Sequence, residues 1–216
     1  GGGVAEAARV LDGLRAEGAD GGLVLGGPAG PELAATCTTR DDLAAAYREI
    51  VTTCDPAFLD FDVRDAADHV AVLRRALAIR AVQEELPVRV AFTLRLQPYG
   101  LAARDVEMLR LTRRHGAEIT TVNLLAELGA REPSEAWDPA VRAAQEQIAD
   151  AHGLTDSRES WRRVALTPLL ARPSDLSEAD ARRLSSFAAR NGLAWLSVRG
   201  AAPRPAVSRV LWRTPA

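Results

Sequence analysis

The sequence predicts an α/β fold in which parallel strands alternate with helices, and three observations support this. Six short runs rich in β-branched or apolar residues are separated by longer segments with the apolar period of a helix. The intervals can hold the crossover helices that connect parallel strands. Helix-boundary residues also stand where they are needed, because Asp41 and Asp42 open one helical segment while Ser177 and Gly192 bracket another.

The predicted strands are residues 22–27, 57–63, 88–96, 119–125, 164–170 and 193–198. The predicted helices are residues 5–17, 40–53, 66–85, 103–114, 135–152 and 176–190, followed by an irregular tail over 201–216. In the helix over 66–85, we expect Val70, Leu73, Leu77 and Val82 near one face. This alternation fits an open doubly wound sheet or a (β/α)8 barrel. The glycine-rich residues 26–30 match neither phosphate-loop pattern and are interpreted as a tight turn.

Composition limits the classes of function. The chain has 216 residues, enough for one domain with a sizeable core. A net charge of −2, with 27 arginines spread among the acids, gives no reason to expect nucleic acid or anionic lipid as a partner. No transmembrane segment or signal peptide is visible, and the opening Gly1-Gly2-Gly3 suggests that the natural start lies upstream. Cys37 and Cys54 fit no metal-binding spacing, so we predict neither metal nor cofactor.

The strand over 57–63 carries the most informative residues. Side chains alternate across a strand, so Asp60, Asp62 and Arg64 are expected on one face, opposite the apolar Leu59 and Phe61. Carboxylates that point into a sheet-enclosed interior are costly unless they pair or accept hydrogen bonds. Two interpretations follow: a structural ion-pair network with Arg64, or a functional site.

A series of motifs in order along the chain extends this observation. They are VLGG (24–27), GPELAATC (30–37), LAAAY (43–47), the D-x-D strand itself, TLRLQPYGL (93–101), VNLLAELG (122–129), ALTPLLA (165–171) and WLSVRG (195–200). Together they resemble the catalytic barrel of bacterial chitinases of glycoside hydrolase family 18. The resemblance implies a (β/α)8 TIM-barrel fold in which residues 1–216 form a single partial domain that supplies strands three to eight. The first two strands would come from upstream sequence.

The resemblance also implies a mechanism and its loss. Family 18 enzymes use substrate assistance, in which a glutamate protonates the glycosidic oxygen and an aspartate orients the substrate's own N-acetyl group. Asp60 and Asp62 match the two motif aspartates, whereas Arg64 occupies the place of the acid. Because a guanidinium stays protonated, it cannot deliver a proton in a catalytic cycle. The family's tyrosine is also replaced, in the stretch Ala126-Glu127-Leu128.

By the same resemblance, substrate-binding roles are expected for Glu127, Asn123, Gln97 and Trp195. For the aromatic under the sugar, the register decides between Trp195 and Leu196. Trp137 follows the strand over 119–125 and is either a sugar platform or a packing residue.

We therefore predict a chitinase-like protein that is catalytically inactive and binds carbohydrate or serves as an interaction domain. Its expected ligand is chitin-like or contains N-acetylglucosamine, and by family analogy it acts outside the cell or on its surface. An alternative is an active glycosidase with a displaced acid, for which Asp65, Asp68 and Glu127 are the candidates. Another is an unrelated α/β protein, such as a phosphotransfer domain, whose D-x-D is coincidental.

Overall fold

The computed structural model describes residues 2–127 and 137–212, and these divide into two compact units. The first unit contains the chain up to Thr93 together with Glu107–Thr120. The second contains Leu94–Val106 and the described residues from Thr121 onward. Each unit is built from parallel strands with helices between them, as the sequence predicts.

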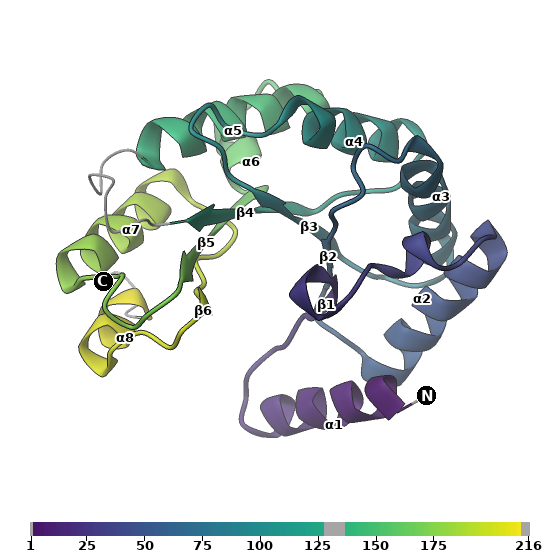
Figure 1. Cartoon of the computed structure of the whole chain (residues 1–216), viewed down its shortest axis with the longest axis horizontal. Coiled ribbons are helices and arrows are strands. Elements are labelled where there is room, and N and C mark those ends of the chain that lie inside the picture. Colours follow the sequence, from purple (N-terminus) through teal and green to yellow (C-terminus); the bar gives the residue numbers. More distant parts are fainter. Residues whose placement is uncertain (1, 128–136, 213–216) are drawn as a thin grey trace. The chain divides into compact units, whose positions relative to one another are not determined.

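The first unit holds the first three strands of the chain. Its elements are α1 (Gly2–Ala16), β1 (Leu23–Gly26), two short 3-10 turns (Gly27–Ala29 and Leu33–Ala35), α2 (Arg40–Cys54), β2 (Leu59–Asp62), α3 (His69–Glu85), β3 (Val90–Arg95) as far as Thr93, and the later part of α4 (Ala103–Arg114). The strands are parallel, with Leu59 of β2 opposite Leu23 of β1 and Val90 of β3. Figure 1 shows α2 and α3 lying side by side, outside these strands.

Side-chain caps mark the starts of α2 and α3. The Thr39 hydroxyl accepts a hydrogen bond from the Asp42 amide at the start of α2, and the Asp68 carboxylate accepts from Val70 and Ala71 at the start of α3. The core behind β2 and β3 is aromatic. The Phe61 ring stacks on Phe92 at a centroid distance of 5.4 Å.

The buried face of α3 differs from the predicted one. The prediction groups Val70 and Leu73 near one face with Val82, but Val70 and Leu73 are exposed, at 65% and 37%, whereas Val82 is buried. The buried residues of α3 are Ala71, Val72, Arg75, Ala76, Ala78, Ile79 and Val82. This face combines alanines, which allow neighbouring elements to approach closely, with larger side chains such as Arg75 and Ile79, which are 1% and 2% exposed.

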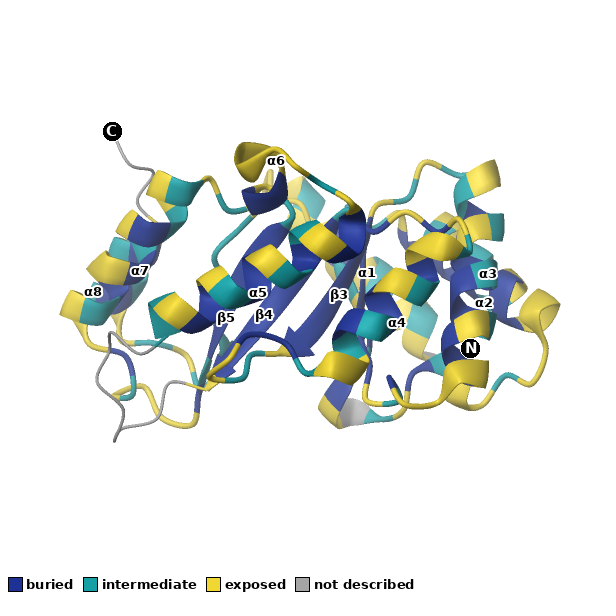
Figure 2. Cartoon of the chain, turned by 90° about the horizontal axis from the view of Figure 1, so that it is seen from above, coloured by how far each residue is buried: buried dark blue, intermediate teal, exposed yellow. Residues whose placement is uncertain are grey.

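Strands and helices also alternate in the second unit. Its elements are β4 (Thr121–Glu127), α5 (Trp137–His152), α6 (Ser157–Trp161), β5 (Val164–Leu170), α7 (Glu178–Asn191), β6 (Arg199–Gly200) and α8 (Pro205–Leu211). β4 and β5 are parallel, with Val122 opposite Val164. Figure 2 shows both strands buried along their length, whereas α5 has a buried and an exposed side. Ser177 and Asp180 form a reciprocal capping box at the start of α7.

Most predicted boundaries agree with the structure to within three residues, but the C-terminal part differs. The strand predicted over 193–198 is irregular there, with only an isolated bridge between Leu196 and Leu166, and regular pairing with β5 is confined to Arg199–Gly200. α8 lies in the tail that was predicted to be irregular, and α6 was not predicted. Part of the helix predicted over 135–152 lies outside the described residues, as does Leu128.

Within residues 2–127 and 137–212, no helix combines the length and the apolar character needed to cross a bilayer.

Candidate functional site

The carboxyl end of β2 carries the two aspartates that the sequence singles out. Asp60 and Asp62 are buried, at 4% and 7% exposure, and Thr93 of β3 lies opposite Asp62 in the strand register. The Thr93 hydroxyl donates a 2.6 Å hydrogen bond to Oδ2 of Asp60. The three side chains therefore share one face of the sheet, as strand alternation predicts for the aspartates. Thr93 contributes the hydroxyl that stabilises a buried carboxylate, a role that the sequence analysis did not assign.

The turn after β1 presses directly against Asp62. Gly26 and Gly27 both have positive φ, at 91° and 82°. A β-carbon on Gly27 would lie 2.6 Å from Oδ2 of Asp62, and one on Gly26 would lie 2.5 Å from the Asp62 carbonyl oxygen. Only glycine combines this backbone conformation with such a close approach. The predicted tight turn over 26–30 thus forms one wall of the site around Asp62.

We expect Gly27→Ala to destabilise the protein more than Gly18→Ala, which is a matched control. Gly18 also has positive φ, at 79°, but a β-carbon there would meet nothing within 4 Å. Gly18→Ala should therefore cost only the backbone strain, about 1–2 kcal/mol. Gly27→Ala should add a packing cost of about 1–3 kcal/mol, because the methyl group displaces the Asp62 carboxylate. Thermal unfolding of both variants measures the difference, and equal losses would show that Gly27 does not constrain Asp62.

Arg64 lies in a bend beyond the end of β2, and its side chain is exposed. It forms no ion pair or hydrogen bond with a residue in the described ranges. Among the described residues, Arg64 therefore does not form the predicted ion-pair network with Asp60 and Asp62. An exposed guanidinium here can donate hydrogen bonds and supply positive charge, but it cannot act as a proton donor in turnover.

A buried ionic cluster, which no sequence pattern predicts, lies beside this strand end. Arg75 of α3 is 1% exposed; its Nε donates to Oε2 of Glu32 at 2.8 Å, and its Nη2 donates to both oxygens of Asp65 at 2.7 and 2.6 Å. The Tyr47 hydroxyl of α2 donates to the other oxygen of Glu32, and the Ala34 amide donates to Oε2. The cluster therefore links α2 and α3 to the loops that follow β1 and β2.

Burial and charge set the protonation states in this cluster. Burial raises the pKa of the Tyr47 hydroxyl far above its ordinary value, and the adjacent Glu32 carboxylate raises it further. Burial by itself would lower the pKa of Arg75, but the charges and hydrogen bonds of Glu32 and Asp65 outweigh it, so that the pKa is raised. Tyr47 thus remains a hydrogen-bond donor and Arg75 remains a cation.

Each carboxylate that the sequence suggests as a displaced acid has a partner in the structure. Asp65 is held through both oxygens by Arg75. Asp68 caps α3 through two backbone amides. Glu127, at the end of β4, forms an ion pair with Arg95 and is exposed. All three side chains have structural partners within their own unit.

The second unit has its own row of polar side chains along its strands. The Thr167 hydroxyl of β5 lies 2.7 Å from Oδ1 of Asn123 on β4 and 2.6 Å from the Ser197 hydroxyl. Because Leu196 pairs with Leu166, alternation puts Trp195 on the same side of the chain as Ser197. In this register, Trp195 lies on the polar face and Leu196 lies on the opposite one. Thr167 and Ser197 were not singled out by sequence, because isolated hydroxyl residues in a strand carry no pattern.

The remaining predicted site residue, Gln97, closes a tight turn. Its backbone exchanges hydrogen bonds of 2.7 and 3.0 Å with Gly100, and its side chain is half-buried. The structure therefore brings Asp60 and Asp62 together in the first unit with Arg64 following them, while Gln97, Asn123, Glu127 and Trp195 lie in the second. Among the described residues, no group of three or more histidine, cysteine or carboxylate side chains is arranged to hold a metal ion.

Comparison with known proteins identifies chitinases in both sequence and structure. No family model matches the chain. A probable bifunctional chitinase/lysozyme of Escherichia coli K12 is 33% identical over 119 residues, and endochitinase 11 of Metarhizium anisopliae is 32% identical over 119 residues. Each match covers 52% of this chain but only 13% and 23% of the two relatives.

Solved structures extend the likeness over nearly the whole chain. The catalytic domain of a hyperthermophilic chitinase from Pyrococcus furiosus has a TM-score of 0.82 with 22% identity, covering 96% of this chain and 77% of that one. Catalytic-site mutants of active domain 2 of a thermostable chitinase from the same organism, in complex with chito-oligosaccharides, give 0.82 with 23% identity over 96% and 76%. The (β/α)8 fold class predicted for this chain is confirmed. The chain is thus chitinase-like in sequence and fold, and the predicted resemblance to glycoside hydrolase family 18 is confirmed.

Proposed function

We propose that this chain binds chitin-like, N-acetylglucosamine-containing oligosaccharides at the carboxyl end of β2 and does not hydrolyse them. The observation that carries the proposal is the end of β2, where Arg64 stands in place of the family's acid while Asp60 and Asp62 remain buried and positioned. The site would then keep groups that orient an N-acetyl sugar but lack the one that protonates the leaving group.

The loss of a general acid has a large effect on rate. Proton transfer by a positioned side chain contributes typically about 10²–10⁴-fold to turnover. Asp65, Asp68 and Glu127 are each engaged in an ion pair or a helix cap. Recruiting Asp65 as a substitute acid would break its hydrogen bonds to the buried Arg75, and recruiting Asp68 would remove the cap of α3. Glu127 would lose only an exposed ion pair with Arg95, which contributes little to stability.

The choice of ligand rests on similarity and on the chemistry of the strand ends. The relatives found by sequence are chitinases, and one structural neighbour is described with chito-oligosaccharides. Buried carboxylates such as those of Asp60 and Asp62 are groups that accept hydrogen bonds from sugar hydroxyls and N-acetyl groups. A polysaccharide ligand of this kind also favours action outside the cell or at its surface.

The test is to measure binding and hydrolysis separately on the same preparation. Chitotetraose is titrated calorimetrically and then incubated with the chain, and products are followed by mass spectrometry. We expect binding without cleavage, and weaker binding to Asp62→Ala because its carboxylate no longer orients the N-acetyl group. Cleavage that disappears in Asp62→Ala would instead favour an active glycosidase with a displaced acid. The absence of both binding and cleavage would refute the proposal.

A further inference from the structure

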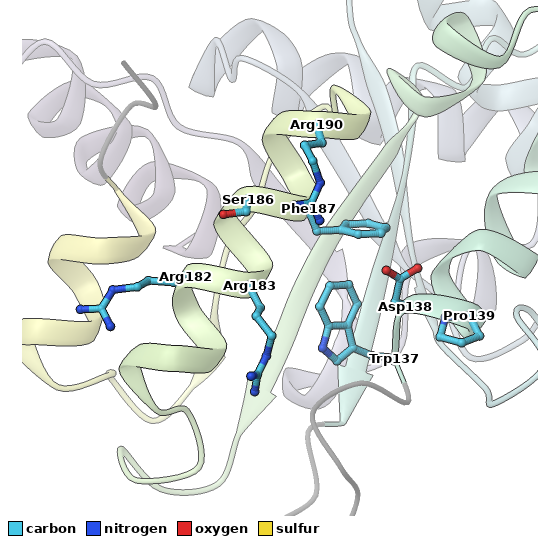
Figure 3. A pocket seen from close by; sticks show the side chains of 8 residues that line it. All are labelled: Trp137, Asp138, Pro139, Arg182, Arg183, Ser186, Phe187 and Arg190. Atoms are coloured by element: carbon cyan, nitrogen blue, oxygen red, sulfur yellow. The ribbon is translucent and has the colours of Figure 1, made fainter.

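A cavity opens between α5 and α7 in the second unit. Its volume is about 470 Å3, within the range of about 300–1,000 Å3 that small-molecule sites occupy. Figure 3 shows its wall, which includes Trp137, Asp138, Arg183, Phe187 and Arg190. Nothing in the proposed function uses these residues.

The floor of this cavity is aromatic. The Trp137 ring meets Phe187 edge to face at a centroid distance of 4.9 Å, and Phe187, 1% exposed, meets Trp161 in the same way at 5.7 Å. Trp137 itself is only half-buried. The contact with Phe187 confirms the packing interpretation of Trp137. Part of the indole also lines the cavity, and the sugar-platform interpretation stays a prediction. A fixed, partly open indole is a platform for the apolar face of a ring.

Two of the charged side chains around Trp137 are neutralised by neighbours, whereas Arg190 is not. Asp138 accepts a 2.5 Å hydrogen bond from Arg142, so its carboxylate is neutralised by a residue of its own helix. Arg183 is likewise paired with Asp180. Arg190, by contrast, is exposed and forms no ion pair with any residue in the described part of the chain.

Arg183 and Arg190 lie on either side of Phe187 along α7. Arg183, Phe187 and Arg190 recur every three to four residues along α7, so they share one face of the helix. Arg183 and Arg190 are separated by two turns, which is about 10 Å along the axis. A cation in the last turn of a helix is favourable in itself. That role leaves the guanidinium donors of Arg190 available at the edge of the cavity.

We propose that the α5–α7 cavity is a second binding site that takes an acidic oligosaccharide, with a sugar ring against Trp137 and its carboxylate paired with Arg190. A simple inorganic anion would make no use of the aromatic floor. A neutral sugar would leave the positive charge of Arg190 unmatched. A carboxylated saccharide satisfies both, because a guanidinium fork binds a carboxylate through two parallel hydrogen bonds.

The test uses trigalacturonate, which carries one carboxylate on each ring, titrated calorimetrically into the chain at low salt. We expect Arg190→Gln to weaken binding by about tenfold or more, since a hydrogen-bonded charge pair is lost. The matched control is Arg209→Gln, which removes an exposed arginine without a described ion pair from the last turn of α8 in the same unit. Arg209→Gln should bind as the unchanged chain does.

Three results would overturn this inference. Equal weakening in Arg190→Gln and Arg209→Gln would show that only net charge matters. Binding of the neutral trisaccharide maltotriose as tightly as trigalacturonate would remove the role of the carboxylate, and binding of sulfate as tightly would remove that of the sugar. This binding measurement is independent of the proposed chitin-like site, because neither variant alters Asp60, Asp62 or Arg64. Failure here would therefore leave the proposed chitin-like binding untouched.

Discussion

Replacement of Arg75 by methionine is expected to lower the free energy of unfolding by about 3–5 kcal/mol, because it leaves the carboxylates of Glu32 and Asp65 without their cation. Glu32 is buried, with 2% of its side chain exposed, so its charge would remain in a medium that solvates it poorly. Methionine keeps much of the aliphatic volume and creates little cavity. The loss would therefore report the ion pairs rather than packing.

Thermal and urea unfolding measure this effect. For a chain of this size the midpoint should fall by roughly 6–20 °C, at about 2–4 °C per kcal/mol. Arg48→Met is the matched control, because Arg48 also donates to a carboxylate, that of Glu85, through hydrogen bonds of 2.7 and 2.6 Å, but this pair is exposed. Pairs in high dielectric contribute little, so Arg48→Met should change the midpoint only slightly. Similar losses in the two variants would contradict the role of the buried cluster.

Substitution of Arg64 by glutamate is expected to create hydrolytic activity toward an aryl chitobioside. The new carboxyl group would stand at the end of β2, beyond Asp60 and Asp62, where the family's acid is expected. Restoring a general acid should raise the rate by about 10²–10⁴-fold over the unchanged chain. Release of the aryl group, followed by fluorescence, measures the gain.

Two further variants make this experiment specific. Arg64→Gln removes the positive charge without supplying a proton donor, so it should remain inactive. Adding Asp62→Asn to Arg64→Glu should abolish the gain, because an amide does not orient and stabilise the N-acetyl group as a carboxylate does. A folded Arg64→Glu variant that binds chitotetraose but shows no turnover would mean that position 64 alone does not account for the missing activity.

Local sequence signals predicted most of the fold. The helix over Ala103–Arg114 and the strand over Val164–Leu170 have the predicted bounds, because helical and strand periodicity and boundary residues coincide there. The last strand was placed too early. Its residues are apolar enough for a strand, but pairing depends on the neighbouring β5, and regular pairing begins only at Arg199.

The buried cluster shows a different limit of sequence analysis. Arg75 stands among Ala71, Ala78 and Val82 on the buried face of α3, and a charge at such a position was a signal that could have been noticed. Its partners Asp65 and Glu32 are 10 and 43 residues away along the chain, and Tyr47 joins the cluster through Glu32. No spacing rule links them, because they meet only when α2, α3 and two loops have packed.

The sequence by itself determined the alternation of strands and helices, the resemblance to chitinases and the presence of Arg64 where an acid is expected, because these depend on local pattern and residue identity. Tertiary structure alone decided which carboxylates are already engaged, how closely Gly27 approaches Asp62, and that Trp137 and Arg190 line one cavity. These features depend on distances between residues far apart in the chain, and only packing sets those distances.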